Sequence, residues 1–189
     1  MRVGVFALQG DVREHLQTLS SLGVEAVEVR NRLQLDSVDG LIFPGGESTT
    51  MSKLIDIFNL RQGLLDFVGT GKPVFGTCAG MIILASEVLD SAAGQKSLAV
   101  MDISVRRNAF GSQLDSFESQ VLFAGALTQV AFIRAPIVER VGQNVEVLAT
   151  LEDGRIVAVR QGNLLATSFH PELTGEKSVH EYFLGMLAT

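Results

Sequence analysis

The stretch GKPVFGTCAGMIILAS, residues Gly71 to Ser86, contains the only cysteine of this 189-residue chain. Val74-Phe75 is a short apolar run typical of a buried strand, and Met81 to Leu84 continue as an apolar helix. Between them, Gly76-Thr77-Cys78-Ala79-Gly80 places glycines on both sides of a nucleophile, which predicts a sharp strand-to-helix turn. Such a turn points the sulfur of Cys78 at free helical N–H groups, which favour a thiolate and can stabilise an oxyanion. Taken alone, the motif is also compatible with a small buried core cysteine.

Upstream of this stretch, strand-like and helix-like patterns alternate. The strands are expected at Val3–Leu8, Val24–Val29 and Leu41–Phe43, the helix at Val12–Leu22 and a helical turn at Leu33–Ser37. This alternation predicts a parallel sheet with right-handed crossovers.

A glycine-rich loop, Pro44-Gly45-Gly46-Glu47-Ser48-Thr49-Thr50, follows the third expected strand. Two consecutive glycines allow the backbone to approach a ligand closely, and either Ser48 or Thr49 suits the N-cap of a helix that carries Met51 to Phe58. Open α/β sheets bind ligands at the carboxyl ends of their strands, where this loop begins. It lacks the Gly-Lys-Ser/Thr of a phosphate-binding loop.

Downstream, the pattern changes to short strands after a polar loop at Asp90–Gln95. The expected strands are Leu98–Arg106, Glu118–Phe123, Val130–Ile133, Val145–Leu151, Arg155–Arg160 and Leu164–Phe169. Asp153-Gly154 indicates a hairpin turn, and the chain is expected to finish in a helix at Ser178–Leu187. We expect a mixed or antiparallel extension of the sheet, within a single domain spanning residues 1–189.

The composition limits the classes of function. The formal net charge is −6, without a basic patch, which argues against binding to nucleic acid or to an anionic membrane surface. A single cysteine permits no internal disulfide and no cysteine-based metal cluster, which suits a reducing cytoplasm. We expect neither a signal peptide nor a transmembrane segment.

A second candidate group for catalysis is His170-Pro171-Glu172, at the end of the last expected strand. In an extended chain residues i and i+2 point the same way, so His170 and Glu172 can lie side by side. A carboxylate on one imidazole nitrogen fixes the tautomer and leaves the other nitrogen to accept a thiol proton. The alternative is a strand-end histidine beside a surface glutamate. His15 and His180 lie in helical patterns with polar neighbours, and we expect both at the surface.

Three separated motifs, Pro44 to Ser48, Gly76 to Gly80 and Phe169 to Glu172, together resemble the class I, or triad, glutamine amidotransferases. Within that superfamily the chain most closely resembles the glutaminase subunits of two-component pyridoxal phosphate synthases. The segments that carry this closer resemblance are Leu8-Gln9-Gly10, Gly45 to Met51, Arg107-Asn108-Ala109-Phe110-Gly111, Asp115-Ser116-Phe117-Glu118, Phe132-Ile133-Arg134-Ala135-Pro136 and Ser168 to Thr174. The resemblance covers the whole chain and implies a flavodoxin-like, three-layer α/β fold whose central, mostly parallel sheet has an antiparallel extension.

The resemblance also implies roles for individual residues. Cys78 attacks the side-chain amide carbon of L-glutamine, His170 is the acid and base, and Glu172 orients His170. The oxyanion hole consists of the backbone N–H of Ala79 and one from the glycine loop, at Gly46. The substrate's α-amino and α-carboxylate ends are expected at Gly46, Glu47, Ser48, Arg107, Ile133 and Arg134.

The resemblance implies that ammonia passes to another chain, because no synthase domain is present. That partner is a barrel-shaped synthase subunit, in a large hetero-oligomer, which makes pyridoxal phosphate (vitamin B6) from a pentose phosphate and a triose phosphate. Pyridoxal phosphate is then the product and not a cofactor of this chain, and no metal is implied. We predict that docking of the partner orders the oxyanion hole. The alternatives are a glutaminase for another acceptor, a related cysteine hydrolase or chaperone, and a non-catalytic module of the same fold.

Overall fold

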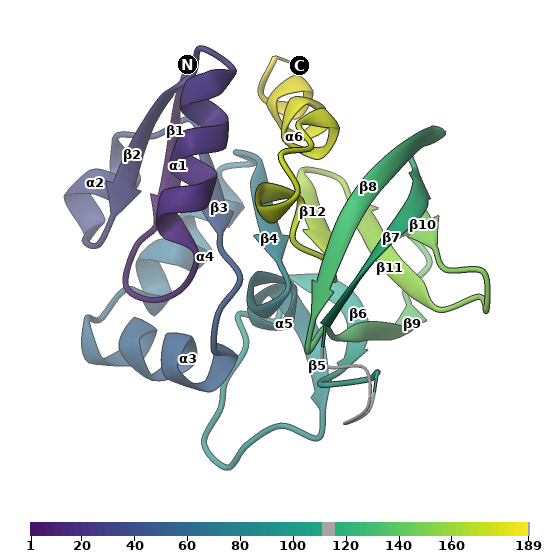
Figure 1. Cartoon of the computed structure of the whole chain (residues 1–189). Helices are drawn as coiled ribbons and strands as arrows, with labels where there is room; N and C mark the ends of the chain where they lie inside the picture. The colour runs from purple at the N-terminus through teal and green to yellow at the C-terminus, as the bar shows by residue number, and fades with distance from the viewer. Residues whose placement is uncertain (111–115, 189) are drawn as a thin grey trace.

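The computed structural model describes residues 1–110 and 116–188. Gly111 and Asp115, which belong to two of the segments named above, lie outside the described residues. Within the described part, ten strands form one mixed sheet and two more pair as a separate hairpin (Figure 1). The strands are β1 (Arg2–Phe6), β2 (Glu25–Val29), β3 (Gly40–Phe43), β4 (Val74–Thr77), β5 (Ala85–Leu89), β6 (Met101–Arg106), β7 (Ser116–Phe123), β8 (Ala126–Ile133), β9 (Ile137–Val141), β10 (Glu146–Thr150), β11 (Ile156–Gln161) and β12 (Leu164–Thr167).

Six α-helices are found in the same residues. They are α1 (Val12–Ser21), α2 (Arg32–Asp36), α3 (Ser48–Ile57), α4 (Arg61–Gly69), α5 (Ala79–Leu84) and α6 (Ser178–Leu187), with a short 3₁₀ helix, η1, at Pro171–Leu173. No helix in residues 1–110 or 116–188 is long and apolar enough to cross a membrane.

The parallel part of the sheet runs in the order β2-β1-β3-β4-β12. Apart from the edge strand β2, its strands are buried on both faces, so successive side chains enter two different cores. In β4, Val74 packs into one core and Phe75 into the other, and in β3 the same alternation separates Leu41 from Ile42. This two-residue alternation explains why these strands read as continuous apolar runs.

Two helical layers cover the two faces. Helices α3, α4 and α5 contribute to the first core, for example through Met51 and Leu64, whereas α1 and α6 contribute Leu19 and Phe183 to the second. Figure 1 shows α1 and the β7–β8 hairpin in front of the sheet, on the side of the second core. The predicted three-layer α/β fold with a mostly parallel central sheet is confirmed.

The second half of the sheet continues β12 in the order β11-β9-β6-β5, with β10 paired to β11. Antiparallel pairing joins β12 to β11, β11 to β9 and β9 to β6, so the predicted antiparallel extension is present. The turn at Asp153-Gly154 connects β10 to its antiparallel partner β11, as the sequence predicted. The hairpin β7–β8 is an exception, because it forms a sheet of its own.

The sequence patterns missed four elements: α4, β5, β9 and the 3₁₀ helix η1, which lies where an extended His170-Pro171-Glu172 was expected. Helix α5 ends at Leu84 because Ala85 turns extended and the carbonyl of Ile83 accepts a hydrogen bond from the distant Leu98 N–H at 2.6 Å. An apolar run that looks like one helix is therefore divided between α5 and β5 by a contact from outside the run.

The turn between β4 and α5 has the strained backbone that its sequence predicted. Cys78 has φ 48° and ψ −101°, a backbone conformation that residues other than glycine rarely adopt. A Cβ atom added to Gly76 would lie 2.5 Å from the Gly80 carbonyl carbon, and one added to Gly80 would lie 2.3 Å from the Phe43 carbonyl oxygen. Both glycines are required because backbone atoms occupy the space of a side chain.

Replacement of Gly80 by alanine is expected to lower the free energy of unfolding by at least about 1–3 kcal/mol, because β3 and α5 must move apart. Gly185→Ala is the matched control, since an added Cβ meets no heavy atom within 4 Å and an alanine in a helix gains about 0.5–1 kcal/mol. Urea denaturation of both variants measures the difference. Equal stability of the two variants would contradict the close packing of Gly80 on Phe43.

Candidate active site

A cleft of about 420 Å³ lies at the carboxyl ends of the central strands and contains the Cys78 side chain. Eight of the site residues expected from the sequence line it: Gly46, Glu47, Ser48, Cys78, Arg107, Ile133, Arg134 and His170. The remaining two, Ala79 and Glu172, are buried beside it. The structure therefore gathers segments that lie far apart in the sequence around one thiol.

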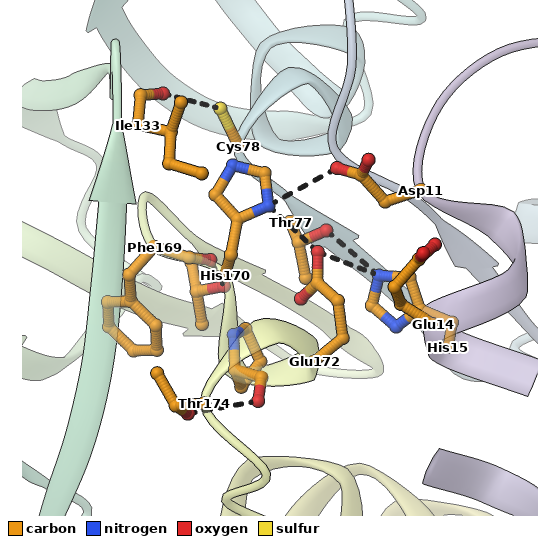
Figure 2. A network of polar contacts seen from close by, with 12 residues as sticks. Asp11, Glu14, His15, Thr77, Cys78, Ile133, Phe169, His170, Glu172 and Thr174 are labelled. Carbon is orange, nitrogen blue, oxygen red and sulfur yellow. Dashed lines mark hydrogen bonds and ion pairs between the residues drawn. The ribbon is translucent and has the colours of Figure 1, made fainter. Parts of the chain in front are cut away.

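His170 and Glu172 form a buried pair directly behind the thiol (Figure 2). The Nδ1 atom of His170 lies 2.8 Å from Oε1 of Glu172, within hydrogen-bonding distance. The backbone of His170 is fixed in turn, because its N–H donates to the carbonyl of Ala131 in β8 at 2.8 Å. His170 is thus held at both its backbone and its imidazole ring.

The electrostatics of this pair favour a protonated His170. Burial by itself lowers the pKa of His170, but hydrogen bonding and charge interaction with Cys78 and Glu172 outweigh burial and raise the pKa to about 11. Burial raises the pKa of Glu172, yet the facing histidines His15 and His170 outweigh that effect and hold it below its usual range. An imidazolium next to a sulfur favours the thiolate, the nucleophilic form of cysteine.

Asp11 supplies a second carboxylate near the same imidazole. Its Oδ2 lies 3.5 Å from Nδ1 of His170, and burial raises the pKa of Asp11. Asp11, His170 and Glu172 bring three atoms that could bind a metal within 4.8 Å of one another. Since His170 Nδ1 already makes a hydrogen bond to Glu172, the proximity of these atoms is explained without a metal ion.

One end of the cleft is built around the start of α3. Glu47 is the N-cap of this helix and accepts hydrogen bonds from the N–H groups of Thr49 and Thr50, so the predicted capping by Ser48 or Thr49 was wrong. Burial raises the pKa of Glu47, but the hydrogen bonds from Thr50 and Thr49 lower it to about 2. A glutamate caps here because its longer side chain can reach back to the first free N–H groups.

Gln95 and Gln9 hold this end of the cleft in place, and the sequence patterns gave a role to neither. The Oε1 atom of Gln95 accepts from Nη1 of Arg107 at 2.9 Å, while its Nε2 donates to Oγ of Ser48 at 3.0 Å. Gln9 accepts from the N–H of Glu47 at 2.9 Å. Gln9 belongs to one of the segments that carry the family resemblance, so a signal existed for it, whereas Gln95 lies in a loop whose pattern gave none.

The end of β8 forms the opposite wall. The thiol of Cys78 lies 3.8 Å from the carbonyl oxygen of Ile133 (Figure 2). Arg134, the next residue, has φ 43°, and both residues are exposed. Strand β8 therefore contacts the thiol through Ile133 and the histidine backbone through Ala131.

His15 and His180 are fully buried, so the prediction that both lie at the surface was wrong. Nδ1 of His15 lies 2.9 Å from Nε2 of His180, and both rings pack edge-on against Phe75. Burial lowers the pKa of His15, and burial together with His15 lowers the pKa of His180 to about 3. Polar neighbours in sequence concealed this burial because α1 and α6 each place their histidine on the face toward the sheet.

A thiol on a strand-to-helix turn, backed by a histidine–glutamate pair on a three-layer, mostly parallel sheet, defines a class I glutamine amidotransferase. Residues 5–189 match the SNO glutamine amidotransferase family. The chain belongs to that family.

Individual relatives agree with this assignment. The chain is 57% identical over 192 residues to the pyridoxal 5'-phosphate synthase subunit PdxT of Salinispora arenicola, covering 98% of this chain and 96% of that protein. The PdxT subunit of Dehalococcoides mccartyi strain BAV1 is 53% identical over 192 residues, with 100% and 98% coverage. A glutamine amidotransferase crystal structure superimposes with a TM-score of 0.93 at 47% identity, covering 99% of each chain. A putative GMP synthase protein from Thermoplasma acidophilum, 18% identical, shares the fold with a TM-score of 0.69 and coverage of 100% and 94%.

Because His180 is buried and its pKa is lowered, we predict that the protein loses stability in acid. Its pKa is lowered to about 3 in the folded chain, whereas an unfolded histidine titrates near 6.5, so the unfolded state binds more protons between these values. Stability from this group is present above about pH 6.5 and is lost as the pH falls toward 3. When the pH falls from 6.5 to 4.5, the free energy of unfolding should decrease in both proteins, and the decrease should be about 1–3 kcal/mol smaller in His180→Asn than in the wild type. Parallel pH profiles of the two proteins in urea denaturation would contradict this assignment.

Proposed function

We propose that this chain is the glutaminase subunit of a pyridoxal 5'-phosphate synthase, which releases ammonia from L-glutamine for a partner synthase subunit. The observation that carries the chemistry is the arrangement of Cys78, His170 and Glu172 in one cleft. The acceptor is proposed from the relatives, since proteins 53–57% identical over nearly the whole chain are named as subunits of that synthase. The cytoplasm is the proposed location, because Cys78 must stay reduced to act.

The proposed reaction has two stages. The Cys78 thiolate attacks the side-chain amide carbon of glutamine, and the protonated His170 gives its proton to the leaving ammonia. A thioester between Cys78 and the glutamyl group remains. His170, now neutral, takes a proton from the attacking water, the thioester bond breaks to give glutamate, and the Cys78 thiolate is restored beside the protonated His170. Glu172 keeps the imidazole oriented and supports its charge in both stages.

The orientation of the glycine loop supports Gly46 as an oxyanion donor. The carbonyl of Gly45 accepts from the Asp11 N–H at 3.0 Å, and a planar trans peptide directs the following N–H of Gly46 to the opposite side. The next N–H, of Glu47, already donates to Gln9. We propose that the N–H groups of Gly46 and of Ala79, at the start of α5, become the pair of donors that a tetrahedral intermediate requires once the partner has docked.

The ends of the glutamine substrate are proposed to bind at the α3 end of the cleft. Arg107 suits the α-carboxylate because a guanidinium can donate two parallel hydrogen bonds. Its side chain is 19% exposed, and its Nη2 lies 3.7 Å from Oε1 of Glu47. Glu47 stays ionised at neutral pH and can attract the α-ammonium group. Ser48, Ile133 and Arg134 complete the proposed contact surface.

A partner is required by the chemistry of the product. Ammonia released into water at neutral pH becomes ammonium, which is not a nucleophile, so ammonia must reach its acceptor along an internal path that excludes bulk water. We propose a barrel-shaped synthase subunit, joined with this chain in a large hetero-oligomer, whose docking orders the oxyanion hole.

Glutamate release from L-glutamine tests this function directly. With the synthase subunit present, the wild-type chain should release glutamate and Cys78→Ala should release none, because the thioester cannot form. Without the partner, the wild-type rate should fall strongly. Release that is independent of the synthase subunit would indicate another acceptor, and no release under any condition would indicate a non-catalytic module.

The substrate subsite is tested by Arg107→Ala in the complex. Loss of a charge-assisted hydrogen bond of about 1.5–3 kcal/mol should raise KM for glutamine about 10–100-fold. The neighbouring Arg106 is the matched control, since it pairs with Glu139 and Asp90 away from the cleft, and Arg106→Ala should change KM less than about twofold. Equal KM values for the two variants would exclude Arg107 from the carboxylate site.

A further inference from the structure

The buried His15 contacts the same carboxylate oxygen that holds His170. Its Nε2 lies 3.5 Å from Oε1 of Glu172 and 3.2 Å from Oγ1 of Thr77, and its own ring is completely buried (Figure 2). The reaction proposed above assigns His15 no step. Its position behind the triad, on α1, nevertheless connects the helical layer to the catalytic carboxylate.

The surrounding contacts indicate which nitrogen of His15 carries the proton. With the proton on Nε2, an N–H faces Glu172 and Thr77, and Nδ1 can accept from the N–H of His180 at 2.9 Å. The opposite tautomer turns a lone pair toward the ionised Glu172. It also makes His180 accept at Nε2 and carry its proton on Nδ1, a buried atom without a hydrogen-bond partner in the described residues. A buried N–H without an acceptor is unfavourable, so the Nε2–H form of His15 is preferred.

Glu172 depends on such a contact because only one of its oxygens is held. Oε2 of Glu172 is buried and has no hydrogen-bond partner among the residues described. Oε1 alone therefore fixes the plane of the carboxylate, between Nδ1 of His170 and Nε2 of His15. Asp11 lies 3.5 Å from the same His170 nitrogen and can replace Glu172 as its partner if Glu172 rotates.

We propose that His15 is a positioning residue for catalysis, whose neutral Nε2–H holds the Glu172 carboxylate in the orientation that directs His170 toward Cys78. The inference rests on the proposed glutaminase function for its kinetic consequences. His15 acts through Glu172, without touching the substrate. The titratable groups that face it are Glu14, His170, Glu172 and His180.

The first test determines the tautomer in the unaltered protein. Nitrogen-15 NMR of histidine-labelled wild-type chain should show His15 neutral and protonated on Nε2, with the assignment made by loss of the signals in His15→Gln. A proton on Nδ1, or a doubly protonated ring at pH 7, would overturn the proposal. This measurement does not depend on catalytic activity.

The second test uses variants in the complex with the synthase subunit. His15→Leu removes the donor and should lower kcat about 10–100-fold, the range expected for loss of a partner that orients a catalytic side chain, with KM for glutamine changed less than about twofold. His15→Gln keeps an N–H at the position of Nε2, so its kcat should be at least about tenfold higher than that of His15→Leu. Thr128→Val, equally buried but in β8 and hydrogen-bonded to Ala126, is the control and should keep its kcat within about twofold.

A third readout separates positioning from general disturbance of the fold. Alkylation by iodoacetamide requires a thiolate, which a neighbouring imidazolium favours at pH 7, whereas at pH 10 an ordinary thiol is ionised without help. In His15→Leu the ratio of the pH 10 rate to the pH 7 rate should rise about tenfold, and in Thr128→Val it should not change. An unchanged ratio and kcat in His15→Leu would refute the positioning role. If the wild-type complex releases no glutamate, the glutaminase proposal fails while the tautomer and alkylation results still test His15.

Discussion

The close approach of α5 to β3 at Gly80 is the constraint on which the rest of the site depends. The backbone of Gly80 packs on the carbonyl of Phe43, and the N–H of Cys78 donates to the carbonyl of Thr167 at 2.8 Å. These contacts hold Cys78 in a backbone conformation that is unfavourable by itself. The strain is tolerated because three neighbouring strands, β3, β4 and β12, fix the turn from both sides.

A second organising feature is the way in which one carboxylate oxygen joins two layers of the molecule. Oε1 of Glu172 lies between His170, which follows β12, and His15, on α1. Low pKa values keep His15 and His180 uncharged, so the charged partner of Glu172 is His170. A buried ion pair is stable only when its remaining polar contacts are well made, which explains why the layer behind Glu172 supplies the neutral imidazole of His15.

The sequence established the parallel half of the sheet and the position of Cys78 on its strand-to-helix turn. Strands buried on both faces are recognisable as short apolar runs, and the glycines around Cys78 reflect a local backbone requirement. The second half of the sheet, in which antiparallel pairs lead to a last parallel pair of β6 with β5, was less accessible. One reason is that the boundary between α5 and β5 is set by a hydrogen bond from the N–H of Leu98 to the carbonyl of Ile83. The N-cap of α3 was predicted wrongly because the expected capping residues have short polar side chains. Here the longer side chain of Glu47 reaches the helix N–H groups instead.

By itself, then, the sequence determined which residues are the candidates for chemistry: a cysteine on a glycine-flanked turn, a His-Pro-Glu at a strand end and a glycine-rich loop. Only the tertiary structure decided which side chains support them. His15, Gln95 and Ala131 contact the site from separate elements, at sequence separations that local periodicity does not encode. The physical reason is that a pattern along one helix or strand reveals its buried face, whereas the atom that meets each buried polar group is fixed by how the layers pack.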